Sequence, residues 1–355
     1  MTFRWAILGT GPVARKFVLG LRYARDAAPV VVASRDRANA ERFGRELGID
    51  RVAADYTAAI ESGVDACYLA TPPNTHAALA VRCLERGVPV LVEKPFTATR
   101  PEAESVRDTA RRHGVFCMEG MWTRFLPAVR EVKRLVDAGD LGRVRGFTGG
   151  FCLPARVDPG RSVFRPDLAG GALLHRAVYP ISLAIHLLGR PAETQGMVDL
   201  GPTGVDEQAV VTARHPGGGL SVARASLRSA GPNDCWVTGE HGVAHLHGPI
   251  YRPSRLSVAR IDPTDPDGSG RWARWRESSV LQGLHQLRDR VTGGPLHRAA
   301  RTTTLRYTGN GYHYEADEVR RCVAAGLIES PVMPLSDSVA VLAAVDRTRM
   351  EVRLS

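Results

Sequence analysis

Short apolar runs alternate with longer amphipathic segments over roughly the first 120 residues of the chain. The apolar runs predict buried strands, and the amphipathic segments between them predict helices. The predicted strands are Trp5 to Leu8, Pro29 to Ser34, Ala66 to Ala70, Val88 to Val92 and Val115 to Met118; the predicted helices are Val13 to Tyr23, a segment ending near Leu47, His76 to Arg86 and Glu102 to Arg112. This alternation predicts an α/β fold, a doubly wound parallel sheet, which we assign to residues 1–122.

The pattern changes after residue 122. One amphipathic segment, 127–138, predicts a helix, and glycine-rich segments with strand-like alternation follow at 144–151, 207–214 and 220–227. A run of strands after alternating units predicts a second, α+β domain over residues 123–355, with a mostly antiparallel open sheet. Further helices are expected at 170–188, 314–325 and 336–351, and an exposed loop at 262–270.

The composition is that of a globular protein and argues against nucleic acid and membranes as partners. A chain of 355 residues with 44% hydrophobic and 24% charged residues is typical of a globular protein of two domains. The formal charge of +10 is scattered, without a long basic run, which argues against nucleic acid as a partner. No leader-like start and no apolar stretch of membrane length are present, so we expect a cytoplasmic protein without membrane contact.

Cysteine and histidine spacing gives no sign of a metal centre. The six cysteines are dispersed without a C-x-x-C pair, which is typical of reduced, buried thiols. His241, His245 and His247 alternate along a strand-like segment and lack a matching carboxylate or cysteine pattern. We therefore expect no bound metal.

A glycine motif follows the first predicted strand and opens the first predicted helix. Residues 9–14 read GTGPVA, which matches G-x-G-x-x-G/A. In this motif Gly9 permits the tight turn and Gly11 lets the backbone approach a pyrophosphate, while Pro12 and Val13 begin the helix whose N-terminus faces the phosphates. The motif in this position predicts a dinucleotide-binding Rossmann domain.

The end of the second predicted strand bears on the choice of cofactor. Enzymes that use NAD usually place an acid there to hold the ribose hydroxyls. This strand ends in Ser34 and Arg35, a hydroxyl and a guanidinium that suit the 2′-phosphate of NADP, and the competing acid Asp36 follows. NADP is therefore favoured over NAD.

Two further segments end predicted strands at the edge where ligands of open α/β sheets bind. After the third strand, Thr71, Pro72, Asn74 and His76 lie in a stiff loop that we expect to wall the cofactor, with His76 at a helix start. Next along the sheet comes the run 93–95, Glu-Lys-Pro.

Lys94 is the strongest candidate for a catalytic residue, since the chain has only three lysines. At a strand end it can hydrogen-bond a substrate oxygen, and partial burial would lower its pKa toward a useful acid/base range. Glu93 is expected to orient Lys94 or the cofactor.

Together these segments resemble the Gfo/Idh/MocA family of oxidoreductases. The runs 9–14, 70–76 and 93–95 match in order and spacing, and MEGMWTRFLP at 118–127 and GYHYEADE at 311–318 resemble the branch of dimeric dihydrodiol dehydrogenases and sugar ketoreductases. The resemblance covers nearly the whole chain. It implies a dinucleotide domain followed by an α+β domain whose open sheet has one face free to form a homodimer or homotetramer.

The resemblance also implies an acid/base group on a helix of the second domain, and here Tyr179 occupies that position. Just before it, where the family reads Asp-Ile-Gly, this chain has His175, Arg176 and Ala177. On a helix, residues 175 and 179 share a face, so His175 could replace the usual carboxylate as a proton shuttle, with a reference pKa near 6.5. The same departure could instead mark altered or lost redox chemistry.

These observations lead to an expected function. We expect an NADP(H)-dependent oxidoreductase that acts on a secondary alcohol or ketone of a small polyhydroxylated ring, with Lys94, Tyr179 and His175 as catalytic residues. Trp122, Arg124 and Arg176 are expected to contact the substrate. A keto-sugar reductase is favoured; the alternatives are a trans-dihydrodiol dehydrogenase and a redox-neutral or non-catalytic NADP(H)-binding protein.

Overall fold

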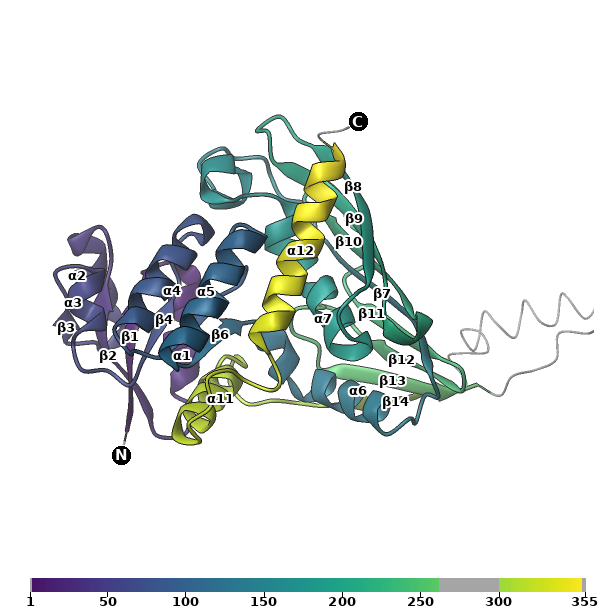
Figure 1. The fold of residues 1–355 in the computed structure, drawn as a ribbon, viewed down its shortest axis with the longest axis horizontal. Coiled ribbons are helices and arrows are strands. Elements are labelled where there is room, and N and C mark those ends of the chain that lie inside the picture. The colour runs from purple at the N-terminus through teal and green to yellow at the C-terminus, as the bar shows by residue number, and fades with distance from the viewer. Residues whose placement is uncertain (1, 262–299, 353–355) are drawn as a thin grey trace, which may run out of the picture.

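A computed structural model describes residues 2–261 and 300–352 (Figure 1). The loop expected at 262–270 lies outside the described residues. Within them the chain forms a six-stranded and an eight-stranded sheet. The expected α/β fold with a second, mostly antiparallel sheet is confirmed.

The first sheet is parallel throughout, in the order β3-β2-β1-β4-β5-β6. Its strands are β1 (Phe3–Leu8), β2 (Ala27–Ala33), β3 (Arg51–Val52), β4 (Ala66–Leu69), β5 (Val90–Glu93) and β6 (Cys117–Gly120). The helices between them are α1 (Pro12–Leu21), α2 (Arg37–Leu47), α3 (Tyr56–Ile60), α4 (His76–Glu85) and α5 (Arg100–His113), with a 3-10 turn, η1 (Pro73–Thr75). The strand order reverses between β1 and β4, and this switch point is where such sheets bind ligands.

Most predicted elements of this half are present within two or three residues of their expected ends. The pattern missed β3 and α3, which have only two and five residues and so carry almost no periodic signal. The strands themselves are dense in buried apolar side chains; Trp5, Ile7 and Leu8 of β1, for example, are fully buried. Burial on both faces explains why these strands read as continuous apolar runs.

The second sheet has the order β14-β13-β12-β11-β7-β10-β9-β8, and every neighbouring pair is antiparallel except β7 with β10. Its strands are β7 (Val144–Cys152), β8 (Glu193–Leu200), β9 (Asp206–Arg214), β10 (Leu220–Ser226), β11 (Cys235–Gly239), β12 (Gly242–Leu246), β13 (Arg255–Arg260) and β14 (Arg301–Thr304). The chain reaches this sheet through η2 (Trp122–Phe125) and α6 (Pro127–Asp137), and later turns are η3 (Ser162–Phe164), η4 (Pro166–Leu168) and η6 (Pro216–Gly218). A π-helical turn, η5 (Leu173–Ala177), leads directly into α7 (Val178–Leu188).

The two C-terminal helices return toward the first sheet. α11 (His313–Ala324) packs against α1 and η2, and α12 (Leu335–Val352) packs against β8, α7 and α5, so it lies between the two sheets (Figure 1). Backbone contacts tie these segments to the first half: Asp317 accepts the Arg25 N–H at 2.9 Å, and Asp346 accepts the Arg100 N–H at 2.7 Å. The chain passes from the first sheet to the second between β6 and β7. The predicted domain boundary between residues 122 and 123 stays a prediction.

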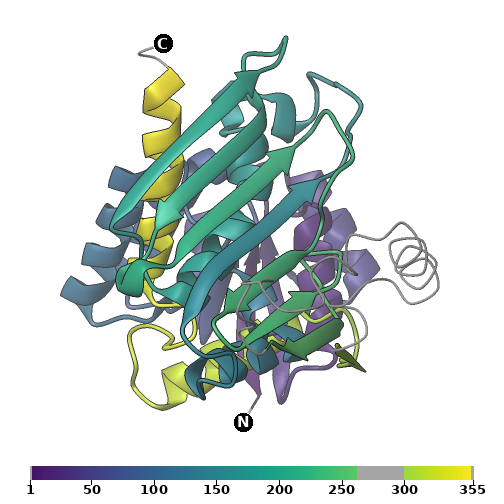
Figure 2. The same ribbon diagram turned by 90° about the vertical axis from the view of Figure 1, so that its right-hand side faces the viewer.

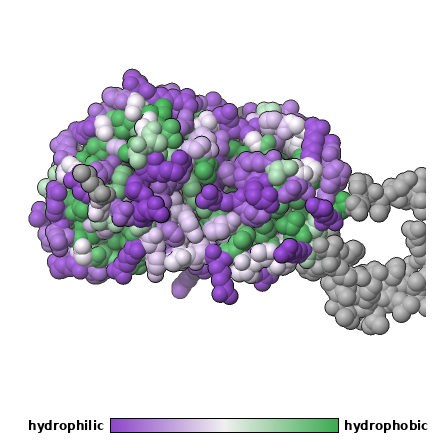
Figure 3. Space-filling view, turned by 90° about the horizontal axis from the view of Figure 1, so that it is seen from below, coloured by the Kyte–Doolittle hydropathy of each residue, from purple (hydrophilic) through white to green (hydrophobic). Residues whose placement is uncertain are grey.

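One face of the second sheet has no described helix over β8, β9 and β10 (Figure 2). Met197, Val210 and Leu220 are exposed there, with Met197 at 78%. A second face, seen from below the view of Figure 1, is mostly hydrophilic, with hydrophobic residues scattered among the hydrophilic ones (Figure 3). The segment 166–188 is long and apolar enough to span a membrane, but 78% of its apolar window is buried inside the fold.

Candidate active site

A cavity of about 750 Å³ opens at the carboxyl edge of the first sheet, at the switch point. Of the residues predicted to bind cofactor or act in catalysis, those that line it are Gly9, Gly11, Pro12, Val13, Ser34, Arg35, Thr71, Pro72, His76, Glu93, Lys94 and His175. The tertiary structure therefore brings five separate segments of the chain to one cavity. Asn74 is an exception: its side chain donates to the Asp167 carbonyl at 3.0 Å, so it joins two loops outside the cavity.

The glycine turn has the shape that a dinucleotide requires. Gly9 has φ +114°, and a Cβ there would lie 2.4 Å from the Ala70 carbonyl oxygen, so only glycine fits. Gly11 has φ −73°, and a Cβ there would meet no atom within 4 Å, because it faces the open cavity. No side chain caps the first turn of α1. A helix N-terminus without a side-chain cap suits a phosphate, and the residues that line the cavity fit the predicted cofactor.

The structure also shows what the acid near the second strand does. Asp36 caps α2: its carboxylate accepts the Asn39 backbone N–H at 3.2 Å and the Asn39 side chain at 2.9 Å. Asp36 also lines the cavity, and each of its carboxylate oxygens keeps a lone pair, so this cap does not by itself distinguish NADP from NAD. Arg35 and Ser34 line the cavity beside it, as the sequence predicted for a 2′-phosphate.

Sequence reasoning missed several residues at this end. Asn39 and Tyr56 line the main cavity, and Arg15 and Arg42 line a smaller adjoining cavity that also reaches Gly11. The sequence did not single these residues out. Arginines are abundant in this chain, so Arg15 and Arg42 carry little signal. That the helix with Asn39 and Arg42 packs next to the glycine turn is known only from the fold.

Replacing Arg35 by alanine is expected to raise KM for NADPH by about 10- to 100-fold and to leave KM for NADH nearly unchanged, because a charge-assisted bond to phosphate contributes about 1.5–3 kcal/mol. Steady-state kinetics with both cofactors measure this. Arg37→Ala is the control, since Arg37 is exposed and pairs with Glu41 on the surface of α2. Equal loss with both cofactors would argue against a 2′-phosphate contact.

His76 fixes the loops around the cavity and is only 1% exposed. Its Nδ1 lies 2.9 Å from the Pro95 carbonyl oxygen and its Nε2 lies 2.9 Å from the Thr71 carbonyl oxygen. Burial lowers its pKa, and the carbonyl contacts oppose that change. His76 therefore links the loop after β4 to the segment that carries Lys94, in agreement with its expected place at a helix start.

Glu93 holds the backbone of its neighbour. One carboxylate oxygen accepts the Tyr68 hydroxyl at 2.5 Å and the other accepts the Lys94 backbone N–H at 3.0 Å. Burial raises the pKa of Glu93 to about 7, although Tyr68 and Lys94 both favour its charged form. The expectation that Glu93 orients Lys94 agrees with these contacts.

Lys94 lies between the two halves of the molecule. Its ammonium donates to the His175 carbonyl at 3.3 Å and lies 5.0 Å from the centre of the Tyr179 ring. Burial lowers the pKa of Lys94, and the charges of Glu93 and Glu119 counteract this. The structure thus places Lys94, His175 and Tyr179 together, as the resemblance implied.

His175 differs from expectation in its protonation. It lies in the π-turn η5 and lines the cavity, and its Nε2 is buried without a hydrogen-bond partner among the described residues. Burial, with the positive charges of Lys94 and Arg176, lowers the pKa of His175 to about 3. The side chain is therefore neutral near pH 7 in the protein without cofactor, and its expected role as a proton shuttle stays a prediction. A neutral imidazole can still hydrogen-bond a substrate.

Tyr179 does not line the cavity, and its side chain is only 6% exposed. Burial and the charge of Glu93 raise its pKa, so its hydroxyl stays protonated. Of the three predicted catalytic residues, only Lys94 has a pKa shifted toward neutrality. A proton exchanged with substrate would therefore be carried by Lys94, with Tyr179 able to donate a hydrogen bond.

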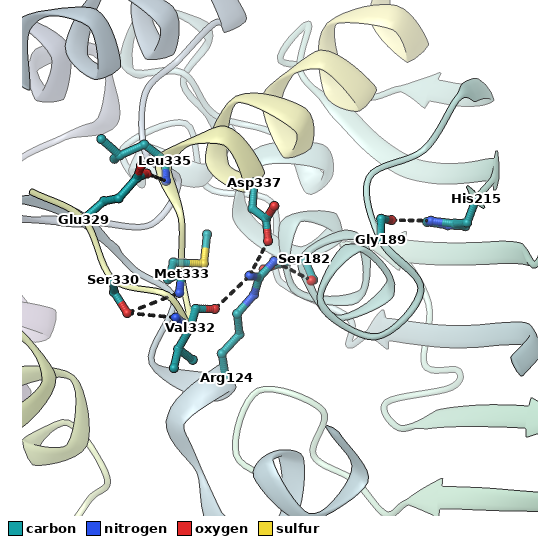
Figure 4. A network of polar contacts seen from close by, with 10 residues as sticks. All are labelled: Arg124, Ser182, Gly189, His215, Glu329, Ser330, Val332, Met333, Leu335 and Asp337. Atoms are coloured by element: carbon teal, nitrogen blue, oxygen red, sulfur yellow. Dashed lines mark hydrogen bonds and ion pairs between the residues drawn. The ribbon is translucent and has the colours of Figure 1, made fainter. Parts of the chain in front are cut away.

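Arg124 does not contact the cavity, which corrects the prediction that it binds substrate. It is 0% exposed, and its guanidinium donates to the Ser182 hydroxyl and carbonyl, to the Val332 carbonyl and to Asp337, over 2.8–3.1 Å (Figure 4). These partners lie on α7 and around the start of α12. Arg124 therefore joins the C-terminal helix to the core.

The other two predicted substrate residues also lie off the cavity wall. Arg176 donates to the carbonyls of Leu153 and Ser226 at the end of the second sheet, so its guanidinium is held by protein oxygens, contrary to the expected role. Trp122 is buried and stacks on Tyr312 at 4.6 Å, and a substrate contact there stays a prediction. Among residues 2–261 and 300–352 no group of three potential metal ligands is present.

Comparison with known proteins agrees with this site. Residues 3–121 match the family described as "Oxidoreductase family, NAD-binding Rossmann fold", and residues 129–245 match the "GFO/IDH/MocA C-terminal domain". The chain is 30% identical to trans-1,2-dihydrobenzene-1,2-diol dehydrogenase of Danio rerio, over 99% of this chain and 97% of that protein. The expected dinucleotide-binding Rossmann domain is thereby confirmed.

Solved structures share the fold over almost the full length. Levoglucosan dehydrogenase in complex with NADH and levoglucosan is 20% identical, with a TM-score of 0.82 over 99% of this chain and 98% of that chain. A 3-ketoreductase from Actinomadura kijaniata in complex with NADP and TDP-benzene is 23% identical, with a TM-score of 0.78 over 99% and 98%. At these identities the likeness establishes the fold.

Proposed function

The chain belongs to the Gfo/Idh/MocA family of oxidoreductases, and from this premise we propose that it is an NADP(H)-dependent reductase of keto groups on sugar rings. The observation that carries the proposal is Lys94, which lies at the cavity edge between the glycine turn and the helix of Tyr179. The cofactor preference rests on Ser34 and Arg35, which line the cavity and suit a 2′-phosphate.

In the proposed reaction the bound nicotinamide supplies a hydride to the carbonyl carbon of the substrate. The chain holds the cofactor by the backbone around Gly9 and Gly11 and by Arg35. Lys94 hydrogen-bonds the carbonyl oxygen, stabilises the charge that develops on it and gives it a proton. Tyr179 lies off the cavity wall with its ring centre 5.0 Å from the Lys94 ammonium, so it supports the position of Lys94, and His175, which lines the cavity, hydrogen-bonds a ring hydroxyl.

The choice of a sugar ring is supported by two polar residues of the cavity lining. His175 and Ser162 both line the cavity, and both side chains can hydrogen-bond ring hydroxyls. Among the relatives, levoglucosan dehydrogenase and the 3-ketoreductase have sugar-related names. The curated relatives are named for an aromatic dihydrodiol, so that dehydrogenase activity is the second candidate.

A single assay distinguishes these candidates. Purified protein is mixed with NADPH and a panel of keto-sugars, free and nucleotide-linked, and absorbance at the NADPH band is followed; a parallel arm offers NADP⁺ and a trans-dihydrodiol. We expect NADPH consumption with at least one keto-sugar. Product formation without net consumption would favour a redox-neutral reaction, and turnover of the dihydrodiol alone would favour the second candidate.

We also propose that the protein is cytoplasmic and forms a homodimer or homotetramer through the outer face of the second sheet. The exposed apolar side chains of Met197, Val210 and Leu220 on β8, β9 and β10 support an interface at this face. Sedimentation measurements test it: Met197→Asp together with Leu220→Asp should give monomers without loss of cofactor binding.

A further inference from the structure

A buried carboxyl on the last strand of the first sheet contacts the segment that carries Lys94. Glu119, on β6, is 0% exposed, and its Oε1 accepts the Phe96 backbone N–H at 3.2 Å. Glu119 belongs to the run 118–127, in which the sequence assigned it no role. Phe96 follows Lys94 by two residues and is itself 0% exposed, so this hydrogen bond fixes the backbone just beyond the lysine.

The backbone of this segment is held at three successive residues. The Lys94 N–H donates to the Glu93 carboxylate at 3.0 Å, and the next carbonyl oxygen, that of Pro95, lies 2.9 Å from the Nδ1 of His76. The hydrogen bond from β6 to the following N–H completes the set. The three side chains that make these contacts are all buried and come from β5, the start of α4 and β6. Residues 94–96 are therefore restrained by three separate elements of the fold.

Glu93 and Glu119 reach the segment from opposite faces of the first sheet. In the register of β5 and β6, Val92 pairs with Glu119, and Glu93 pairs with Gly120. Paired residues on neighbouring parallel strands point to the same face, and successive residues along a strand alternate between faces. Glu119 therefore lies on the face of Val92, and Glu93 lies on the other. The two acids restrain the segment from two sides.

Restraint of this backbone matters because the Lys94 side chain reaches across to the second half of the molecule. Its ammonium donates to the His175 carbonyl at 3.3 Å and lies 5.0 Å from the centre of the Tyr179 ring. The lysine stem is long and flexible, so a shift of its backbone displaces the ammonium. A catalytic group that is misplaced by about 1 Å can lose about 100-fold in rate.

We propose that Glu119 is a positioning residue for Lys94: its carboxyl oxygen holds the Phe96 N–H, fixes the segment 94–96 and thereby sets where the ammonium lies in the cavity. The inference rests on the proposed function, in which Lys94 gives a proton to the substrate. Glu119 acts here as a hydrogen-bond acceptor, so its charge is not required. A neutral side chain with an oxygen in the same place should keep the arrangement, and a charged side chain that is too short should lose it.

Two substitutions separate the acceptor from the charge. E119Q removes the charge and keeps a carbonyl oxygen at the reach of Oε1, whereas E119D keeps the charge and withdraws the oxygen by one methylene. The matched control is T97V, in the same segment. Thr97 is 1% exposed, and its hydroxyl donates to the Thr99 carbonyl at 2.8 Å. T97V therefore removes a buried hydrogen bond without removing any of the three restraints on residues 94–96.

The first readout is single-turnover ketone reduction with saturating NADPH. E119D should be about 10- to 100-fold slower than wild type, and E119Q and T97V should stay within about 3-fold of it. KM for NADPH should change by less than about 3-fold in all three variants, since in the proposed function the glycine turn and Arg35 hold the cofactor phosphates.

The second readout measures the position of the ammonium without substrate. Reductive ¹³C-dimethylation labels the three lysines, and a Lys94→Arg sample identifies the NMR signal of Lys94. That signal senses the ring current of Tyr179, whose ring centre lies 5.0 Å from the ammonium. Compared in its protonated form, at the low-pH end of a titration, it should keep its wild-type position in E119Q and T97V. In E119D it should move toward the positions of the other two lysines.

Two results would overturn the proposal. A loss in E119Q as large as that in E119D would mean that the charge matters rather than the acceptor. An E119D protein with the wild-type rate and the wild-type Lys94 signal would mean that the bond to Phe96 does not position the lysine. The NMR comparison needs no substrate, so failure of the keto-sugar assay and failure of this inference are separate outcomes.

Melting curves check that each variant folds. If E119D does not fold, E119M replaces it, because methionine has the length of glutamate and lacks its carboxyl acceptor. If neither variant folds, Glu119 maintains the fold as a whole rather than the position of Lys94, and the proposal fails.

Discussion

Replacing Lys94 by methionine is expected to lower kcat for ketone reduction by about 10³-fold, because a positioned proton donor contributes about 10²- to 10⁴-fold. Methionine keeps the length and apolar stem of lysine, and it removes the charge and the hydrogen bond to the His175 carbonyl. The measurement is single-turnover reduction with saturating NADPH, which excludes effects on cofactor binding. Lys133→Met is the control, since Lys133 pairs with Asp137 on the surface of α6.

The pH dependence of the same reaction gives a second readout. Burial lowers the pKa of Lys94, so the protonated donor is present at low pH and is lost as pH rises through that lowered value. Ketone reduction should therefore fall on the alkaline side in wild type, and Lys94→Met should lose that limb. A Lys94→Met enzyme that keeps wild-type turnover and the same profile would refute the proposed role of Lys94.

Replacing Gly11 by alanine is expected to weaken NADPH binding by about 100-fold while leaving thermal stability almost unchanged. In the free protein a Cβ on Gly11 meets nothing within 4 Å and φ is −73°, so alanine fits without strain. The methyl group would instead occupy the space that the pyrophosphate needs, and losing about two charge-assisted bonds corresponds to that factor. Fluorescence titration with NADPH and a melting curve measure the two effects.

Gly9→Ala is the contrasting variant. Its Cβ would lie 2.4 Å from the Ala70 carbonyl oxygen at φ +114°, so we expect a loss of about 3 kcal/mol of stability together with the loss of binding. Comparing Gly9→Ala with Gly11→Ala therefore distinguishes the role of the motif in forming the turn from its role in binding the pyrophosphate. Weak binding in Gly9→Ala with full affinity in Gly11→Ala would mean that the cofactor phosphates do not lie over this turn.

Local sequence signals were sufficient for the first half of the molecule. The strand before Gly9, the glycine turn and the lysine that ends β5 each follow from a few adjacent residues, because strand burial and tight turns are encoded over short distances. Parallel strands bring their carboxyl ends to one edge, so the sequence also predicted that residues 9, 35, 71 and 94 would meet. The structure places them around one cavity.

Residues whose role depends on distant neighbours could not be assigned in this way. Arg124 looks like a substrate ligand in sequence, but its partners Ser182, Val332 and Asp337 lie 58 to 213 positions away. Arg176 is likewise held by carbonyls of the second sheet. A guanidinium binds protein oxygens as readily as substrate oxygens, and only the packing shows which of them it meets.

The sequence by itself determined the α/β fold, the cofactor edge and Lys94, since these depend on short-range patterns and on the geometry common to parallel sheets. Only the tertiary structure decided the protonation around Lys94. Burial makes His175 neutral, and burial also lowers the pKa of Lys94. The charge of a side chain depends on its solvent and its neighbours in space, and neither is a property of the adjacent residues in the chain.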